Sequence, residues 1–520
     1  MKRGTAVLFG GITLLGALLR LWSPGRIGIW RDEAQLLNIG ALPGYGAICR
    51  FLVAHESHPP LMYFLAHVTH GASGLSAVLL LCAIAAIPLT FMIGRAADSD
   101  LAGLLAAAAL AFSLPVIING VQLRPYGVLA TVLALSTLAL TKAVCDDRAA
   151  WRSAWAVTSL VALYLHHIAV LMLAAQVGAV LVLWLMQPAV RPSARRWPYW
   201  LGAVAVLAVP DLHLLVTQSQ SAGHLAAGGG MVLFPWWLLG HSALGHPAVL
   251  LLPLLASVTL LRLPRSPRAN SPATRAWLVA VSYGMLILFM TVATYRAGFL
   301  AVQTIVMTAP LSLVLPSIVV ARLWRSGRAF WCAVAVEALI VGLGIDGVAW
   351  WGYVKGNAQE VARFVAAEAK PSDLLIVAPG SLGTSFNYET PSRLSQIDFP
   401  FMGAVQRYPF DHHFERMADL TALQATLDSI ETAAAAGRRV WMVMQADWVR
   451  TGVQPWALDA ERYGALGAAD ASRANYLRGY LQKHLGAAAT VLVPDSSVRS
   501  TEQLQAELFV PARRPASATP

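Results

Sequence analysis

The stretch AVLFGGITLLGALLRLW at residues 6–22 is followed at residues 30–34 by WRDEA, and these two segments decide how the chain is interpreted. The first is apolar and nearly as long as a membrane-crossing helix, which needs about 20 mostly apolar residues. The second places two acids beside the membrane, where burying a charge is costly. A cleaved signal peptide is the alternative for the first stretch, but no small-residue cleavage pattern follows it, and more apolar runs come later. We expect a retained first helix.

The composition indicates a membrane protein. Of the 520 residues, 57% are hydrophobic and 12% are charged, whereas soluble chains carry about 25% charged residues. A net charge of +11 is compatible with nucleic-acid binding, but the arginines lie in short gaps between apolar runs rather than on one polar face. We therefore expect no nucleic-acid partner. The four cysteines form no close pair, which disfavours both a disulfide framework and a thiolate metal site.

The apolar runs predict about 11 transmembrane helices. If the N-terminus, with Lys2 and Arg3, lies inside, every second loop is rich in arginine and the outer loops are poor in it, as the positive-inside rule requires. This orientation predicts an integral protein of a bacterial-type plasma (inner) membrane, with a cytoplasmic N-terminus and a periplasmic or extracellular C-terminal region. The expected spans are 6–22, 75–94, 101–119, 126–144, 153–166, 168–187, 198–216, 246–263, 276–295, 298–320 and 329–350.

Three parts are expected along the chain: a transmembrane domain at 1–351, a soluble α/β domain at 352–511 and a disordered tail at 512–520. The large first outer loop, 23–74, includes Leu61–Val68, which is too short to cross and is expected to be an interfacial helix. The triple glycine in 217–230 predicts a mobile loop, and 234–244 predicts another half-buried helix. In the C-terminal part, the alternation predicts helices at 358–369, 423–436 and 474–484, and strands at 374–378, 440–444 and 490–493.

Acids and histidines in the first outer loop are the first candidate site residues. Asp32 and Glu33 could supply a base for an acceptor hydroxyl or amine, or hold a cation; a solvated loop charge or a helix-start cap is the alternative. Glu56 and His58 lie at a turn that two prolines fix before Leu61–Val68. Their spacing matches no standard zinc signature. We expect them to form part of a polar pocket, with a divalent-cation site of Asp32, Glu56 and His58 left open.

Arginines, a tyrosine and a histidine at other outer helix junctions complete the set. Arg124 and Arg296 are suited to an anionic phosphate, because the guanidinium fork donates two parallel hydrogen bonds; an arginine that reaches from the interface to water is the alternative. Tyr126 follows Arg124 closely, and His167 lies at a third junction, where a structural histidine is common. Polar groups that gather at one membrane face indicate a functional site.

These motifs resemble those of a known family. The segments 30–34 (WRDEA) and 58–63 (HPPLMY), followed by 122–126 (QLRPY) and 164–167 (YLHH), are similar to the GT-C glycosyltransferases over about residues 1–350. The similarity is to the glycosyltransferase family 39 branch, with the protein mannosyltransferases and the lipid A aminoarabinose transferase. Glu56 stands at the family's acid position before His-Pro-Pro. The chain departs from the pattern at Gln122, Leu123 and Pro125, although the arginine and the tyrosine of that motif are kept.

The resemblance implies a hexosyl- or pentosyltransferase that takes a sugar from a polyprenyl-phosphate carrier and passes it to an envelope glycan, lipid or protein acceptor. Asp32 would be the general base and Arg124 and Arg296 would stabilise the departing phosphate, with Glu33, Glu56, His58, Tyr126 and His167 as substrate-binding residues. An ordinary aspartate is ionised near neutral pH, as such a base must be. Two other readings stay open: a transporter or flippase for a lipid-linked or anionic substrate, and a membrane-anchored assembly factor whose working part is the C-terminal domain.

Overall fold

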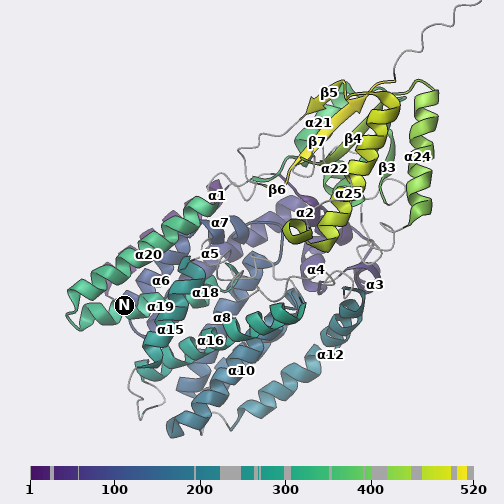
Figure 1. Cartoon of the computed structure of the whole chain (residues 1–520). Coiled ribbons are helices and arrows are strands. Elements are labelled where there is room, and N and C mark those ends of the chain that lie inside the picture. The colour runs from purple at the N-terminus through teal and green to yellow at the C-terminus, as the bar shows by residue number, and fades with distance from the viewer. Residues whose placement is uncertain are drawn as a thin grey trace, which may run out of the picture. The chain divides into compact units, whose positions relative to one another are not determined.

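The computed structural model of the chain contains two compact units, which are described separately below (Figure 1). Unit 1 comprises Met1–Arg26, His58–Thr217 and Gly230–Trp351, and unit 2 comprises Ile27–Ser57, Gln218–Gly229 and Gly352–Pro520. The structure describes residues 2–23, 28–56, 58–191, 195–222, 247–262, 268, 271–297, 306–350, 354–389, 393–400, 407, 419–446, 460–492 and 500–511. The expected half-buried helix at 234–244 and the expected tail lie outside this set. Residues 217–222 of the expected mobile loop are helical, and the rest of that loop lies outside the set as well.

Unit 1 is a bundle of apolar helices, and the chain is an integral membrane protein. Seven helices in the described residues are long and apolar enough to cross a membrane, and an eighth span is formed if the bent pair of α6 (Asp100–Phe112) and α7 (Leu114–Gly120) counts as one. The seven are α1 (Arg3–Trp22), α5 (Ala72–Ala97), α8 (Tyr126–Asp146), α10 (Ala169–Met186), α12 (Trp197–Ala222), α16 (Pro272–Ala297) and α20 (Ala329–Trp350).

The other expected spans of unit 1 are also helical where the structure describes them, but they are shorter. They comprise α9 (Ala149–Leu165), the π-helical turn η5 (Pro247–Leu251) continued by α15 (Leu252–Leu261), and α18 (Ala309–Ser312) with α19 (Val314–Arg325). The stretch expected to be an interfacial helix forms α4 (Leu61–Val68), and the short turn η2 (Pro188–Val190) follows α10. The described part of every expected span is therefore helical, apart from one or two residues at breaks and ends, such as Ser113.

A break between α6 (Asp100–Phe112) and α7 (Leu114–Gly120) bends this span by 66°. Pro115 has no N–H, so the carbonyl of Ala111 loses the helical donor that it would otherwise have. Arg20 of α1 replaces the lost donors: its guanidinium is fully buried and donates to the carbonyls of Leu110 at 3.2 Å and Ala111 at 3.3 Å. The last carbonyls of a helix need partners, above all where lipid excludes water. Arg20 thus stabilises the bend.

Replacing Arg20 with methionine should destabilise unit 1 without adding bulk. Each carbonyl that loses its partner in a buried setting costs about 1–3 kcal/mol, so we expect a clearly lower midpoint in thermal unfolding of the detergent-purified protein. Arg3→Met is the matched control, because Arg3 lies exposed at the other end of the same helix. Equal midpoints for the two variants would contradict this role of Arg20.

Unit 2 is built around a five-stranded mixed sheet of order β3-β2-β4-β7-β5. Strands β2, β3 and β4 are parallel, and β7 runs antiparallel to both β4 and β5. A separate parallel ladder joins β1 and β6. The strands are β1 (Val354–Gly356), β2 (Leu374–Ala378), β3 (Ser395–Asp398), β4 (Val440–Gln445), β5 (Thr490–Leu492), β6 (Ser500–Glu502) and β7 (Leu504–Phe509).

Helices cover both faces of this sheet, because successive side chains of each strand point to opposite sides. Ile376 of β2 packs with apolar side chains of α24 (Leu420–Ala435) and α25 (Ala460–Leu485), whereas its neighbour Leu375 packs with α21 (Ala358–Glu368) and α22 (Gly383–Glu389). Because such a strand is buried on both faces, its sequence is a continuous apolar run. The α/β domain and the six elements expected in it are confirmed; β1, β3, β6, β7 and α22 were not expected.

Part of segment 23–74, the expected first outer loop, packs within unit 2 rather than within unit 1. It forms α2 (Arg31–Gly40) and α3 (Tyr45–His55). Helix α2 contains the acid pair, and α3 ends shortly before the His-Pro-Pro turn. The sequence instead predicts residues 23–74 as part of the transmembrane domain. The candidate base Asp32 therefore belongs to the same compact unit as the C-terminal α/β domain.

Candidate active site

Helix α2 begins immediately before the acid pair. Gly28 has a φ of 74°, a left-handed conformation that glycine adopts without strain, and Trp30 is extended. Asp32 and Glu33 then occupy the first helical turn, where the unpaired N–H groups favour negative charge. The backbone N–H of Trp30 donates to Oε2 of Glu33 at 3.4 Å. Glu33 therefore does cap the helix start, which was one of the alternatives that the sequence left open.

Glu33 is fully buried and forms an ion pair with Lys355 of β1. The Lys355 ammonium donates to both carboxylate oxygens, at 2.9 Å and 2.8 Å, and it is itself 1% exposed. A buried carboxylate needs such a cation, because desolvation without one is expensive. The two residues are 322 positions apart in the chain. This contact ties the start of α2 to the C-terminal domain.

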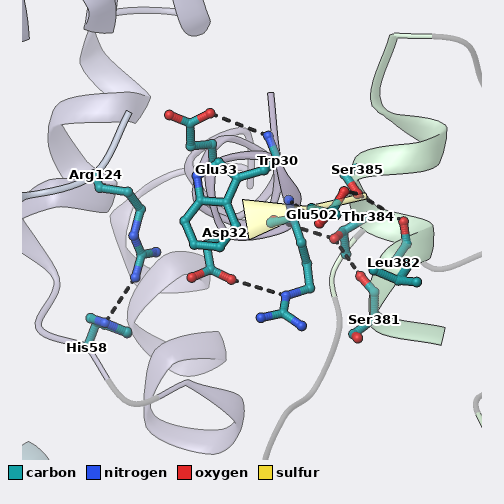
Figure 2. A network of polar contacts seen from close by, with 11 residues as sticks. Trp30, Asp32, Glu33, His58, Arg124, Ser381, Leu382, Thr384, Ser385 and Glu502 are labelled. Carbon is teal, nitrogen blue, oxygen red and sulfur yellow. Dashed lines mark hydrogen bonds and ion pairs between the residues drawn. The ribbon is translucent and has the colours of Figure 1, made fainter. Parts of the chain in front are cut away.

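Asp32 precedes the buried Glu33 in the sequence, but part of its own carboxylate is accessible to solvent. Its side chain is 23% exposed, and Oδ1 accepts a hydrogen bond from Nε of Arg31 at 3.2 Å (Figure 2). This exposure distinguishes it from Glu33 and fits a group that must reach a substrate. A partly exposed carboxylate beside a fixed cation can accept a proton from an acceptor hydroxyl or amine.

Glu502 of β6 is a further acid at this place, which the sequence reading missed. It is 3% exposed; Oε2 accepts from the backbone N–H of Arg31 at 3.0 Å, and Oε1 accepts from the Ser385 hydroxyl at 2.5 Å (Figure 2). Burial raises the pKa of Glu502 to about 7, although the hydrogen bond from Ser385 and the charge of Arg31 oppose that rise. No local pattern around residues 500–502 marks this acid, because its strand is three residues long.

Unit 1 holds a second polar cluster, at the turn between α7 and α8. Arg124 is 6% exposed, and its Nη2 lies 3.3 Å from Nε2 of His58 (Figure 2). Because a guanidinium can only donate, the ring nitrogen of His58 must accept, so this contact takes a neutral imidazole. The Tyr126 ring lies 5.9 Å from the guanidinium carbon. Arg124, His58 and Tyr126, three of the predicted site residues, are therefore brought together.

His166 joins this cluster, although it is not one of the predicted site residues. Its ring makes an edge contact with His58 at 5.4 Å and lies 6.5 Å from the Tyr126 ring. The backbone N–H of Ile168 donates to Nδ1 of His166 at 3.2 Å, which leaves the proton of a neutral ring on Nε2.

His167 pairs with an acid that the sequence reading did not single out. Its Nε2 lies 3.5 Å from Oδ1 of Asp211, a residue of α12 that is 3% exposed. An acid inside an expected span is itself a signal, since such residues are rare in membranes and usually functional. Asp211 was therefore detectable in the run at 198–216.

The predicted site residues are divided between the two units. Asp32, Glu33 and Glu56 belong to unit 2, and Glu56 ends helix α3, half-buried; Arg124, His58, Tyr126 and His167 belong to unit 1. The backbone of Arg296 belongs to α16, and its side chain lies outside the described residues.

Within the described part of the chain, no group of three or more His, Cys, Asp or Glu residues could hold a metal ion. Because Asp32 and Glu56 belong to unit 2 and His58 to unit 1, the cation site of Asp32, Glu56 and His58 stays a prediction.

Comparison with known proteins identifies the fold. No protein-family model matches the sequence, and no curated protein matches it either. Among solved structures, ArnT from Cupriavidus metallidurans bound to undecaprenyl phosphate matches over 100% of this chain and 100% of its own, with a TM-score of 0.52 and 14% identity. The Archaeoglobus fulgidus oligosaccharyltransferase tethered to an acceptor peptide matches over 91% of this chain and 72% of its own, with a TM-score of 0.53 and 10% identity.

The fold is therefore that of the GT-C glycosyltransferases, a polytopic helical membrane protein with a small α/β domain. At identities of 10–14% the similarity establishes the fold, and the resemblance inferred from the motifs is confirmed at that level. The family 39 branch stays a prediction.

Proposed function

We propose that this protein is a membrane glycosyltransferase that moves a sugar from a polyprenyl-phosphate-type donor to an acceptor on the outer face of the membrane. The observation that carries the proposal is the placement of Asp32 in a chain with the GT-C fold. Its carboxylate is partly exposed, while both of its neighbours in the sequence are fixed by contacts to the C-terminal domain. ArnT, which shares the fold, was crystallised with undecaprenyl phosphate.

In the proposed reaction, Asp32 removes the proton from the acceptor hydroxyl or amine as that atom attacks the anomeric carbon of the sugar. The bond between this carbon and the phosphate oxygen breaks, and the electron pair leaves with the polyprenyl phosphate. A single displacement of this kind inverts the anomeric centre. Arg124, with Arg296 as a second candidate, would stabilise the charge that grows on the departing phosphate.

The direct test is to identify donor and acceptor. Mass spectrometry of envelope glycans, lipids and glycoproteins from cells with and without the gene should reveal one missing hexose or pentose. The purified full chain in lipid nanodiscs should then restore that sugar to an envelope fraction from the deficient cells, with undecaprenyl-phosphate-linked sugars as donors. Unchanged envelopes, combined with no transfer in vitro, would contradict the proposal. Transfer that survives excess EDTA would show that no exchangeable divalent cation is required.

Arg124 gives a prediction about donor binding. Lysine keeps the charge but loses the two-pronged geometry that suits phosphate, and one charge-assisted hydrogen bond is worth about 1.5–3 kcal/mol. We therefore expect Arg124→Lys to raise the KM for the lipid-linked donor about tenfold or more. Arg152→Lys is the matched control, because Arg152 is also buried but pairs with Asp147 at 2.5 Å. A KM that rises equally in both variants, or in neither, would contradict phosphate binding by Arg124.

A further inference from the structure

The two residues that flank Asp32 are held by a single small element of the C-terminal domain. Lys355 of β1 binds the Glu33 carboxylate, and Glu502 of β6 binds the backbone N–H of Arg31. Strands β1 and β6 form one parallel ladder, in which Gly356 pairs with Glu502. The ladder therefore contacts the start of α2 at two points, one on each side of the proposed base.

The two strands of the ladder and the start of α2 pack closely against one another at these contacts. A Cβ atom at Gly356 would lie 2.9 Å from the backbone oxygen of Glu502 and 3.7 Å from the Cβ of Trp30, so glycine lets the two strands and the start of α2 approach one another. On the other side, the Thr384 hydroxyl of α22 donates to the Ser381 carbonyl at 2.8 Å and lies 3.5 Å from the carbonyl of Arg31. The N–H of Arg31 is thus bonded to the C-terminal domain, and its carbonyl lies beside the same domain.

Ser385 connects Glu502 to the body of that domain. Its hydroxyl lies within hydrogen-bond distance of Glu502 Oε1, at 2.5 Å, and of the Leu382 carbonyl, at 3.1 Å. One hydroxyl proton can serve only one acceptor at a time. With Glu502 ionised, Ser385 donates to it; with Glu502 protonated, the carboxyl can donate to Ser385, which then donates to Leu382. Because burial raises the pKa of Glu502 to about 7, both forms occur near neutral pH, and a glutamine at this position can make the hydrogen bonds of the protonated form.

We propose that Glu502 is a positioning residue for the transfer reaction: by fixing the backbone of Arg31 it sets the direction of the Asp32 carboxylate, and the C-terminal domain thereby takes part in catalysis. This inference rests on the proposed function, in which Asp32 is the base. Arg31 transmits the effect, since its N–H is bonded to Glu502 and its Nε to Asp32. A displacement of about 1 Å in a reacting group can lower the rate about 100-fold.

The test compares three variants of the full chain in nanodiscs, with tritium-labelled sugars on undecaprenyl phosphate as donors and envelope from gene-deficient cells as acceptor. Glu502→Ala should lower kcat about 10- to 100-fold and leave the donor KM within about twofold. Glu502→Gln should recover kcat to within about threefold, because its amide oxygen still accepts from the Arg31 N–H. Glu507→Ala is the control: Glu507 is equally buried, but it is bonded to Arg478 and Gln505.

Hydrogen exchange of the α2 amides supplies a readout that needs no turnover. Glu502→Ala should speed exchange at the start of α2, whereas Glu507→Ala should not. A folded Glu502→Ala variant with the wild-type kcat and wild-type exchange would overturn the inference, as would a Gln variant as slow as the Ala variant or an equal loss of kcat in Glu507→Ala. If the wild-type chain transfers no sugar, the proposed function fails, and the exchange result still decides whether Glu502 anchors α2.

Discussion

Asp32→Asn should reduce sugar transfer by about 100- to 10,000-fold, which is the range in which loss of a general base lies. The substitution keeps the size of the side chain, and its amide oxygen can still accept from Nε of Arg31, as the Asp32 carboxylate does at 3.2 Å. We therefore expect a folded protein that binds its donor with a KM near the wild-type value. The loss should appear in kcat, because the proton-accepting group is absent while the binding groups remain.

Two further variants serve as comparisons for Asp32→Asn. Asp32→Glu restores a base but moves it by one methylene group, so activity between those of the Asn variant and the wild type is expected. Glu368→Gln removes a carboxylate from the exposed surface of α21 and should change nothing. If Asp32→Asn transfers sugar at the wild-type rate, Asp32 is not the base. A transporter would still transport its substrate with this substitution, so Asp32→Asn also distinguishes a glycosyltransferase from a transporter.

Hydropathy and periodicity predicted the elements that depend on local sequence. The helix Leu61–Val68 and the strand Leu374–Ala378 have the expected bounds, because each is a short apolar run between clear helix or strand breakers. Strand β7 was missed although Leu504, Ala506 and Leu508 alternate with polar residues, a period of two that marks a strand. That signal was present in the sequence.

The contacts that hold the acid pair could not be predicted in the same way. The ion pair of Glu33 and Lys355 joins residues 322 positions apart, and the bond from Arg31 to Glu502 spans 471 positions. Neither partner stands in a pattern that requires a charge. The sequence predicts that the acids of WRDEA lie beside the membrane and need a reason to be there, whereas tertiary packing decides which acid is buried and which is exposed.

Lys355→Met should destabilise the protein by about 3–5 kcal/mol, because it removes the cation from a fully buried carboxylate. Glu33 has no exposed surface, and both of its oxygens accept from the Lys355 ammonium. The cost is expected as a lower denaturation midpoint and as early loss of the C-terminal domain in limited proteolysis. Arg439→Met is a suitable comparison, since its partner Asp373 is also buried but belongs to a different part of unit 2.

Removing both charges of the pair separates an anchoring role of Glu33 from a substrate-binding role. In the double variant Glu33→Met, Lys355→Met, two apolar side chains replace a buried ion pair, a change that is often neutral or stabilising. We expect most of the lost stability to return, apart from the weak cap to Trp30 at 3.4 Å. If Glu33 only anchors α2, sugar transfer should return with stability; a stable but inactive double variant would instead assign Glu33 to the substrate, as the family resemblance implies.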